Sequence, residues 1–115
     1  MAVTKVYLGD RVDLEFYQNY PIINYFFSVY NDDGTWYSFA NSSGVYFKLF
    51  AKKGGSLIAT IQMGLDSPPT NLIYMNDLNT SPSIVHQRKG RTAWHECYSV
   101  EGGQNKLLFE GVSEL

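Results

Sequence analysis

The feature that most constrains this fold is the stretch of residues 31–64, in which glycine turns separate runs of alternating side chains. Residues 31–34 (NDDG) and 53–56 (KGGS) are turn sequences, because glycine adopts a positive φ without a Cβ clash. Apolar and polar side chains alternate in residues 44–53 and again in residues 57–63. A period of two is that of a β-strand with one buried face. The stretch therefore predicts three consecutive strands.

Strand signals continue on both sides of this stretch. Further strands are predicted at residues 11–17, 22–30, 72–75, 91–100 and 106–112, and the first of the three strands within the stretch is a short one at residues 35–39. Residues 1–10 are expected to form a lead-in, residues 76–90 a long polar loop, and Trp94 is expected to point into the core. The frequent turns and the lack of a long helical pattern predict an all-β fold. We expect a single domain over residues 1–115, an antiparallel immunoglobulin-like β-sandwich of about eight strands.

The composition excludes several classes of protein. The chain is 44% hydrophobic and only 17% charged, which indicates a folded core and not a disordered segment. A net charge of −2 gives no electrostatic attraction to nucleic acid or to an anionic membrane. No apolar run is long enough to span a bilayer, and the N-terminus lacks a signal-peptide pattern. With Cys97 as its single cysteine, the chain is expected to fold in a reducing cytoplasm.

One local cluster, at residues 95–97 (HEC), contains residue types that bind metals. His95 and Cys97 would share a strand face, but a structural zinc site needs four ligands, and His86 is the sole other strong candidate. We therefore interpret His95 and Cys97 as structural residues. The acidic pair in residues 31–34 fits a turn, where Asp forms local hydrogen bonds. Because no catalytic motif is present, we expect no enzymatic activity, no cofactor and no metal.

Aromatic residues make up 16% of the chain, and strand alternation cannot place all of them in one core. Tyrosine and tryptophan are common at protein interfaces. A basic cluster at residues 87–91 could contact an acidic neighbour in an assembly, although a solvated loop leading into a strand is the preferred interpretation. The residues predicted to form an interface are Tyr30, Trp36, Tyr37, Tyr46, Arg88, Lys89 and Arg91. The alternative is a carbohydrate- or ligand-binding module in which Trp36 or Trp94 stacks on a sugar ring.

The order of turns and strands resembles a known family over residues 11–112. The motifs that carry the resemblance are VYNDDG at 29–34, VYFKL at 45–49, KKGG at 52–55, Gly90 before WHECY at 94–98, GG at 102–103 and LLFEG at 107–111. This pattern is similar to the small immunoglobulin-like modules of tailed-phage virions, notably the amino-terminal domain of upper baseplate proteins.

The resemblance implies a non-enzymatic structural protein of a phage virion. Such a protein is made in the host cytoplasm and assembles with other virion proteins as part of an oligomeric structure. In the upper baseplate proteins the module precedes a linker and a receptor-binding or scaffold part, whereas this sequence ends at Leu115. The expected role is therefore a head decoration, a head–tail connector or a tail or baseplate accessory subunit.

Overall fold

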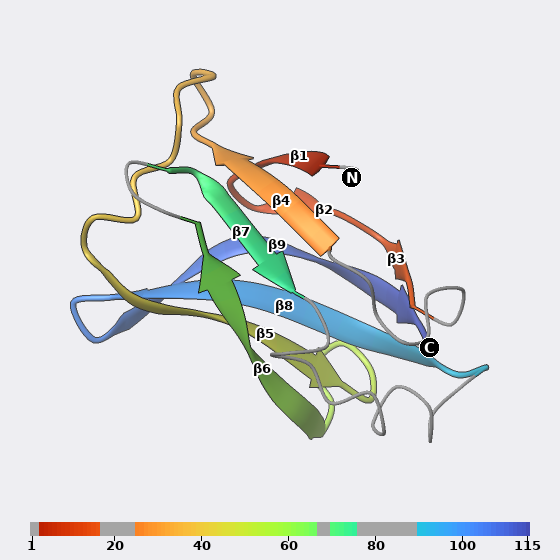
Figure 1. Cartoon of the computed structure of the whole chain (residues 1–115). Coiled ribbons are helices and arrows are strands. Elements are labelled where there is room, and N and C mark those ends of the chain that lie inside the picture. The colour runs from red at the N-terminus through yellow and green to blue at the C-terminus, as the bar shows by residue number, and fades with distance from the viewer. Residues whose placement is uncertain (1–2, 17–24, 67–69, 76–89) are drawn as a thin grey trace.

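The computed structural model describes residues 3–16, 25–66, 70–75 and 90–115, and this part of the chain is entirely β-structure and loops (Figure 1). The all-β expectation is confirmed. None of the described segments forms a helix that could cross a membrane. The strands are β1 (Val3–Tyr7), β2 (Asp10–Arg11), β3 (Leu14–Glu15), β4 (Tyr25–Tyr30), β5 (Ser42–Phe50), β6 (Leu57–Leu65), β7 (Leu72–Met75), β8 (Thr92–Glu101) and β9 (Gln104–Glu114).

The strands form one mixed sheet that folds into two halves. The first half contains β1, β4 and β7, and the second contains β5, β8, β9 and the short strands β2 and β3. Strand β6 belongs to both halves, because most of it pairs with β5 while its last two residues, Gly64 and Leu65, pair with β7. In Figure 1 the first half lies in front of β8 and β9, so the core is enclosed between the two halves.

The N-terminal segment joins the two halves on the other side. Strand β1 runs parallel to β4, and the chain then changes partner between two successive residues. The Leu8 N–H donates to the Tyr30 carbonyl at 3.1 Å, and the Gly9 N–H donates to the Leu108 carbonyl at 2.9 Å. Gly9 has φ +80°, a conformation that glycine adopts without strain. Beyond Gly9, β2 and β3 run parallel to β9.

Three of the sequence predictions about the strands are wrong. The sheet is not fully antiparallel. The chain keeps one direction as it passes from the first half to the second, so β1 pairs in parallel with β4, and β2 and β3 pair in parallel with β9. Residues 1–10 are not a simple lead-in, since they contain β1. Residues 35–39 make only a single bridge, between Trp36 and Tyr30, and not a strand. The chain turns there toward β5, as the Ser42 N–H bonds the Phe39 carbonyl at 3.0 Å.

The core is built from aromatic rings of facing strands. Phe27 of β4 and Phe109 of β9 have ring centroids 4.7 Å apart, and Phe47 of β5 lies 6.4 Å from Phe109. All three rings are fully buried. Burying a side chain of this size contributes roughly 1.5–3 kcal/mol, and the contact between Phe27 and Phe109 joins the two halves. Other fully buried apolar residues in the described part of the chain include Val6, Phe16, Val29, Leu49, Ile73, Met75, Cys97, Leu108 and Leu115.

Trp94 does not point into the core, so that prediction is also wrong. Its strand neighbour His95 faces inward, and Trp94 lies on the outer face of β8, opposite Phe50 and Val112. The ring is nevertheless only 7% exposed. Lys53 Nζ lies 5.1 Å from the ring centroid and the Arg11 guanidinium carbon 5.7 Å, so two cations cover it.

We predict that Gly111→Ala destabilises the fold more than Gly44→Ala. A Cβ at Gly111 would lie 2.2 Å from the backbone carbonyl oxygen of Val12, whereas one at Gly44 would meet the Tyr46 ring at 2.8 Å. A side chain can rotate away, but the backbone at Val12 must shift. We expect Gly111→Ala to lower the free energy of unfolding by about 1–3 kcal/mol and Gly44→Ala by less. Urea denaturation measures both, and equal losses would contradict the prediction.

Candidate interaction surface

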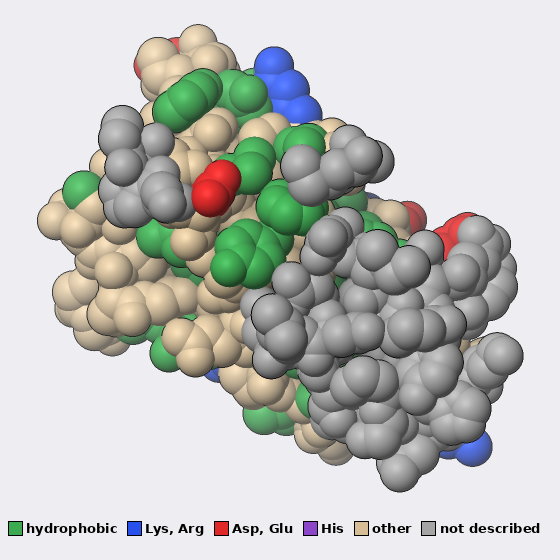
Figure 2. Space-filling model, viewed as in Figure 1, with side chains coloured by type: hydrophobic (Ala, Val, Ile, Leu, Met, Phe, Trp, Pro, Cys, Tyr) green, Lys and Arg blue, Asp and Glu red, His purple; other side chains and the backbone are tan. Residues whose placement is uncertain are grey.

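The outer surface of the first half of the sheet collects aromatic side chains. Strand pairing aligns Tyr7 of β1 with Tyr30 of β4, Tyr74 of β7 with Phe26 of β4, and Trp36 with Tyr30. The alternating neighbours on β4, Phe27 and Val29, are buried, so the aligned residues point outward. Figure 2 shows hydrophobic side chains gathered over β4 and β7 on this side. We call Tyr7, Phe26, Tyr30, Trp36 and Tyr74 the aromatic face.

Contacts between the rings hold the aromatic face in place. Phe26 and Tyr74 stack with centroids 5.4 Å apart, and Tyr7 and Tyr30 lie 5.8 Å apart. Lys5 Nζ sits 4.4 Å from the Tyr30 ring centroid, and its hydrogen bond with Tyr7 raises the pKa of Lys5 above its usual value. The rings are therefore ordered before any partner binds, which lowers the entropy lost on association.

Tyr74 lies across a glycine of the neighbouring strand. A Cβ at Gly64, which pairs with Tyr74, would come within 2.2 Å of the Tyr74 ring. The missing side chain lets the ring lie close to the backbone of β6. Gly64 therefore shapes the aromatic face although it contributes no side chain to it.

Trp36 connects the aromatic face to a pocket of about 460 Å³. Residues 36–40 line one part of it, and Leu65 and Thr70 complete the lining. The side chains of Trp36 and Leu65 are 60% and 39% exposed, which is high for large apolar residues. This volume is within the range that accommodates a ligand or a side chain of a partner.

The hydroxyl groups of the pocket already have hydrogen-bond partners. Ser38 Oγ accepts from the Ala40 N–H at 3.3 Å, and Thr70 Oγ1 accepts from the Leu72 N–H at 2.9 Å. These bonds leave the pocket with a mainly apolar character.

Tyr37 belongs to a polar network behind the pocket. Its hydroxyl donates to Glu101, and Ser99 Oγ lies 2.8 Å from both the Glu101 carboxylate and Ser42 Oγ. Burial, together with the Glu101 carboxylate, raises the pKa of Tyr37 well above its usual value. Tyr37 therefore stays neutral and acts as a structural residue, with one side facing the pocket.

The structure brings together only some of the predicted interface residues. Tyr30 and Trp36 lie on the aromatic face, and Tyr37 lies beside it but is only 7% exposed. Tyr46 is on the outer face of the second half, opposite Tyr98 of β8. Arg91 is exposed near the C-terminus, where its carbonyl accepts from the Leu115 N–H. Arg88 and Lys89 lie outside the described residues.

Three members of the aromatic face were not identified from the sequence. Phe26 could have been identified, because alternation along residues 22–30 places it on the same strand face as Tyr30. Tyr7 could not be found without β1 and its register against β4. Tyr74 was placed correctly in a strand, but the neighbours of that strand are set by long-range pairing.

Of the residues considered as metal ligands, His95 and Cys97 are buried, and His86 lies outside the described residues. His95 and Cys97 both face the core, as expected from their shared strand face, and burial strongly raises the pKa of the Cys97 thiol. The described residues contain no group of three or more potential metal ligands. Asp33 Oδ1 accepts from the Thr35 N–H at 3.0 Å and its hydroxyl at 2.6 Å, which confirms the turn interpretation.

Comparison with known proteins finds similarity among solved structures only. No protein-family model matches the sequence, and no curated protein matches it. Among solved structures, the N-terminal domain of phage TP901-1 ORF48 is similar, with 12% sequence identity and a TM-score of 0.49. The comparison covers 100% of both chains.

We predict that the ring of Trp36 contributes little to folding, in contrast to Phe39, three residues further along the same segment. Phe39 is 6% exposed and belongs to the core, whereas Trp36 is 60% exposed. We expect Trp36→Ala to change the free energy of unfolding by less than about 0.5 kcal/mol, and Phe39→Ala to lower it by about 3–5 kcal/mol. Thermal and urea denaturation check both values. A large loss for Trp36→Ala would show that its ring is part of the core.

Proposed function

We propose that the chain is a non-enzymatic structural subunit of a phage virion that binds other virion proteins through the aromatic face and the adjoining pocket. The observation that carries the proposal is the aromatic face, five rings on one outer sheet surface with Trp36 largely exposed. Exposed apolar patches of this kind mark interaction sites, and Tyr and Trp dominate binding hot spots. The assignment to a virion rests on the sequence resemblance to tailed-phage modules.

The pocket favours an apolar side chain of a partner protein as its occupant. Its large exposed residues are Trp36 and Leu65, and the hydroxyls of Ser38 and Thr70 accept local backbone hydrogen bonds. An aliphatic or aromatic side chain entering the pocket would remove both exposed residues from water. Such a residue would be the anchor of the interface.

The non-enzymatic part of the proposal is supported by the state of the candidate nucleophile. Cys97 is fully buried, and burial raises its pKa, so the thiolate is not formed near neutral pH. His95 lies on the same inner face, shielded from solvent. Neither group can reach a substrate in the folded state.

A carbohydrate-binding module is the second candidate, favoured by the exposure of Trp36 beside a pocket. Sugar recognition combines a stacking ring with polar groups that bind the hydroxyls of the sugar. Here the pocket hydroxyls hold local backbone bonds, and the second tryptophan, Trp94, is covered by Lys53 and Arg11. The surface therefore fits a protein partner better than a glycan.

The first experiment is quantitative mass spectrometry of purified phage particles from the source of the sequence. We expect the polypeptide to be present in a fixed number of copies, because virion subunits follow the symmetry of their assembly. Up to about a dozen copies would place it in the tail or neck, and on the order of hundreds would make it a head decoration. Its absence from particles would refute the virion assignment.

A matched pair of variants tests the surface itself. We expect Trp36→Ala to reduce incorporation into particles by about tenfold or more, the effect of losing one hot-spot residue. Tyr46→Ala, on the opposite half of the sheet, should be incorporated like the wild type. Quantitative mass spectrometry of particles assembled with each variant gives the ratio.

Equal incorporation of Trp36→Ala and the wild type would contradict the role of the aromatic face. A glycan array with the isolated protein tests the second candidate. Saturable glycan binding that is lost in Trp36→Ala would favour the carbohydrate-binding function over assembly.

A further inference from the structure

A short N-terminal segment lies over the second half of the sheet, where two-residue ladders to β9 and the buried side chains of Leu14 and Phe16 hold it. We call residues 10–16 the strap; it contains β2 and β3, each only two residues long. The Val12 N–H donates to the Glu110 carbonyl at 2.8 Å, and the Phe16 N–H to the Glu114 carbonyl at 2.7 Å. Short ladders of this kind open more easily than the long strands beneath them.

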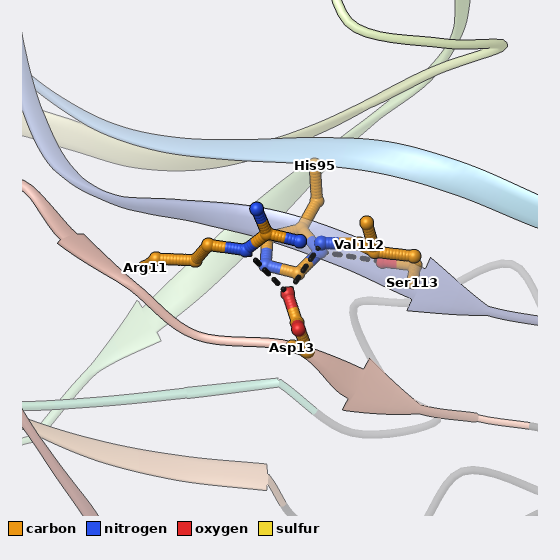
Figure 3. A network of polar contacts seen from close by, with 5 residues as sticks. All are labelled: Arg11, Asp13, His95, Val112 and Ser113. Carbon is orange, nitrogen blue, oxygen red and sulfur yellow. Dashed lines mark hydrogen bonds and ion pairs between the residues drawn. The ribbon is translucent and has the colours of Figure 1, made fainter.

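The strap covers a buried histidine. His95 of β8 pairs with Gly111 of β9, and the Val12 backbone lies directly against Gly111. Figure 3 shows His95 reaching from β8 toward the segment that connects β2 and β3. Its Nδ1 lies 2.6 Å from Ser113 Oγ, whereas Nε2 is buried without a hydrogen-bond partner in the described part of the chain.

The charges around His95 do not compensate for its burial. From the strap, Asp13 faces the ring, and it also bonds Arg11 Nε at 3.2 Å and the Val112 N–H at 2.9 Å. Glu96 is the acidic neighbour on its own strand. The groups that pack against the ring from β5 and β9 are the uncharged Phe47 and Phe109. Burial lowers the pKa of His95 to about 4, although the Val12 carbonyl, Asp13 and Glu96 each favour the protonated ring.

We propose that the strap is an acid-sensitive latch, in which uptake of a proton by His95 favours a state with the strap lifted from β9. Lifting the strap lets water reach Nε2, which hydrates the charged ring, while the ladder between β5 and β8 stays formed. In the lifted state the solvated histidine regains an affinity for protons close to that of a free side chain.

The direction of the effect follows from the two protonation equilibria. The pKa of His95 is about 4 with the strap closed, below its usual value of 6.5, so the lifted state binds the proton more tightly. The stability of the closed state relative to the lifted state is therefore greatest above pH 6.5 and decreases as the pH falls toward 4. The Val112 N–H and Arg11 also hold the pKa of Asp13 below its usual value, so protonation of Asp13 at still lower pH acts in the same direction.

Amide hydrogen exchange followed by NMR tests the latch in the wild-type protein. Between pH 7 and pH 5, the strap amides of Val12 and Phe16 should lose about twentyfold in protection, after correction for the intrinsic pH dependence of exchange. Amides of the β5–β8 ladder should keep their protection. An equal loss of protection in both regions would mean that acid unfolds the whole domain, and would overturn the proposal.

Two variants assign the effect to His95. His95→Gln keeps a polar group near Ser113 but cannot titrate, so its strap protection should not depend on pH between 7 and 5. His86→Gln removes the other histidine of the chain and should behave like the wild type. An unchanged pH dependence in His95→Gln would refute the latch. NMR titration of the wild-type imidazoles remains decisive if His95→Gln does not fold, and a pKa of 6 or above for His95 would also overturn the proposal.

Discussion

The whole arrangement depends on the point where the N-terminal chain passes from one half of the sheet to the other. Successive amides of an extended chain point to opposite sides, and here Leu8 bonds β4 while Gly9 bonds β9. Without this crossing, β4 and β9 would both be open edges, and open edges invite pairing with other chains. The crossing also places Val6 in the core on one side and Phe16 on the other.

The same segment connects the aromatic face with the strap. Its first part contributes Tyr7 to the aromatic face, and its later part lies over His95. Between them, the Tyr7 N–H donates to the Asp10 carboxylate at 2.9 Å, which fixes the turn at Gly9. A displacement of the strap would therefore be transmitted to the edge of the aromatic face, because only the residues of this turn separate Tyr7 from the strap.

Local signals predicted the later strands well and the N-terminal segment poorly. Strand β7 (Leu72–Met75) was predicted with its observed bounds, and the turn at Gly102 and Gly103 has positive φ at both residues, as a two-residue hairpin requires. Strand β1 was missed because, among the described strands, it pairs with β4, which is distant in the sequence: Val3 is aligned with Phe26. The phase of β8 was wrong because both of its faces carry apolar side chains, so alternation alone could not show which one is covered.

The two tryptophans show why the candidate surface was only partly predictable. From the sequence, both Trp36 and Trp94 are considered for stacking on a sugar ring, although Trp94 is expected to point into the core. In the structure, Trp94 bonds Glu96 through its ring N–H at 3.0 Å and lies under the cations of Lys53 and Arg11. Each such cation contact contributes about 0.5–1 kcal/mol, so this ring is part of the fold. Arg11 and Lys53 come from distant parts of the chain. That long-range placement, which no local pattern contains, covers Trp94 and leaves Trp36 as the exposed tryptophan.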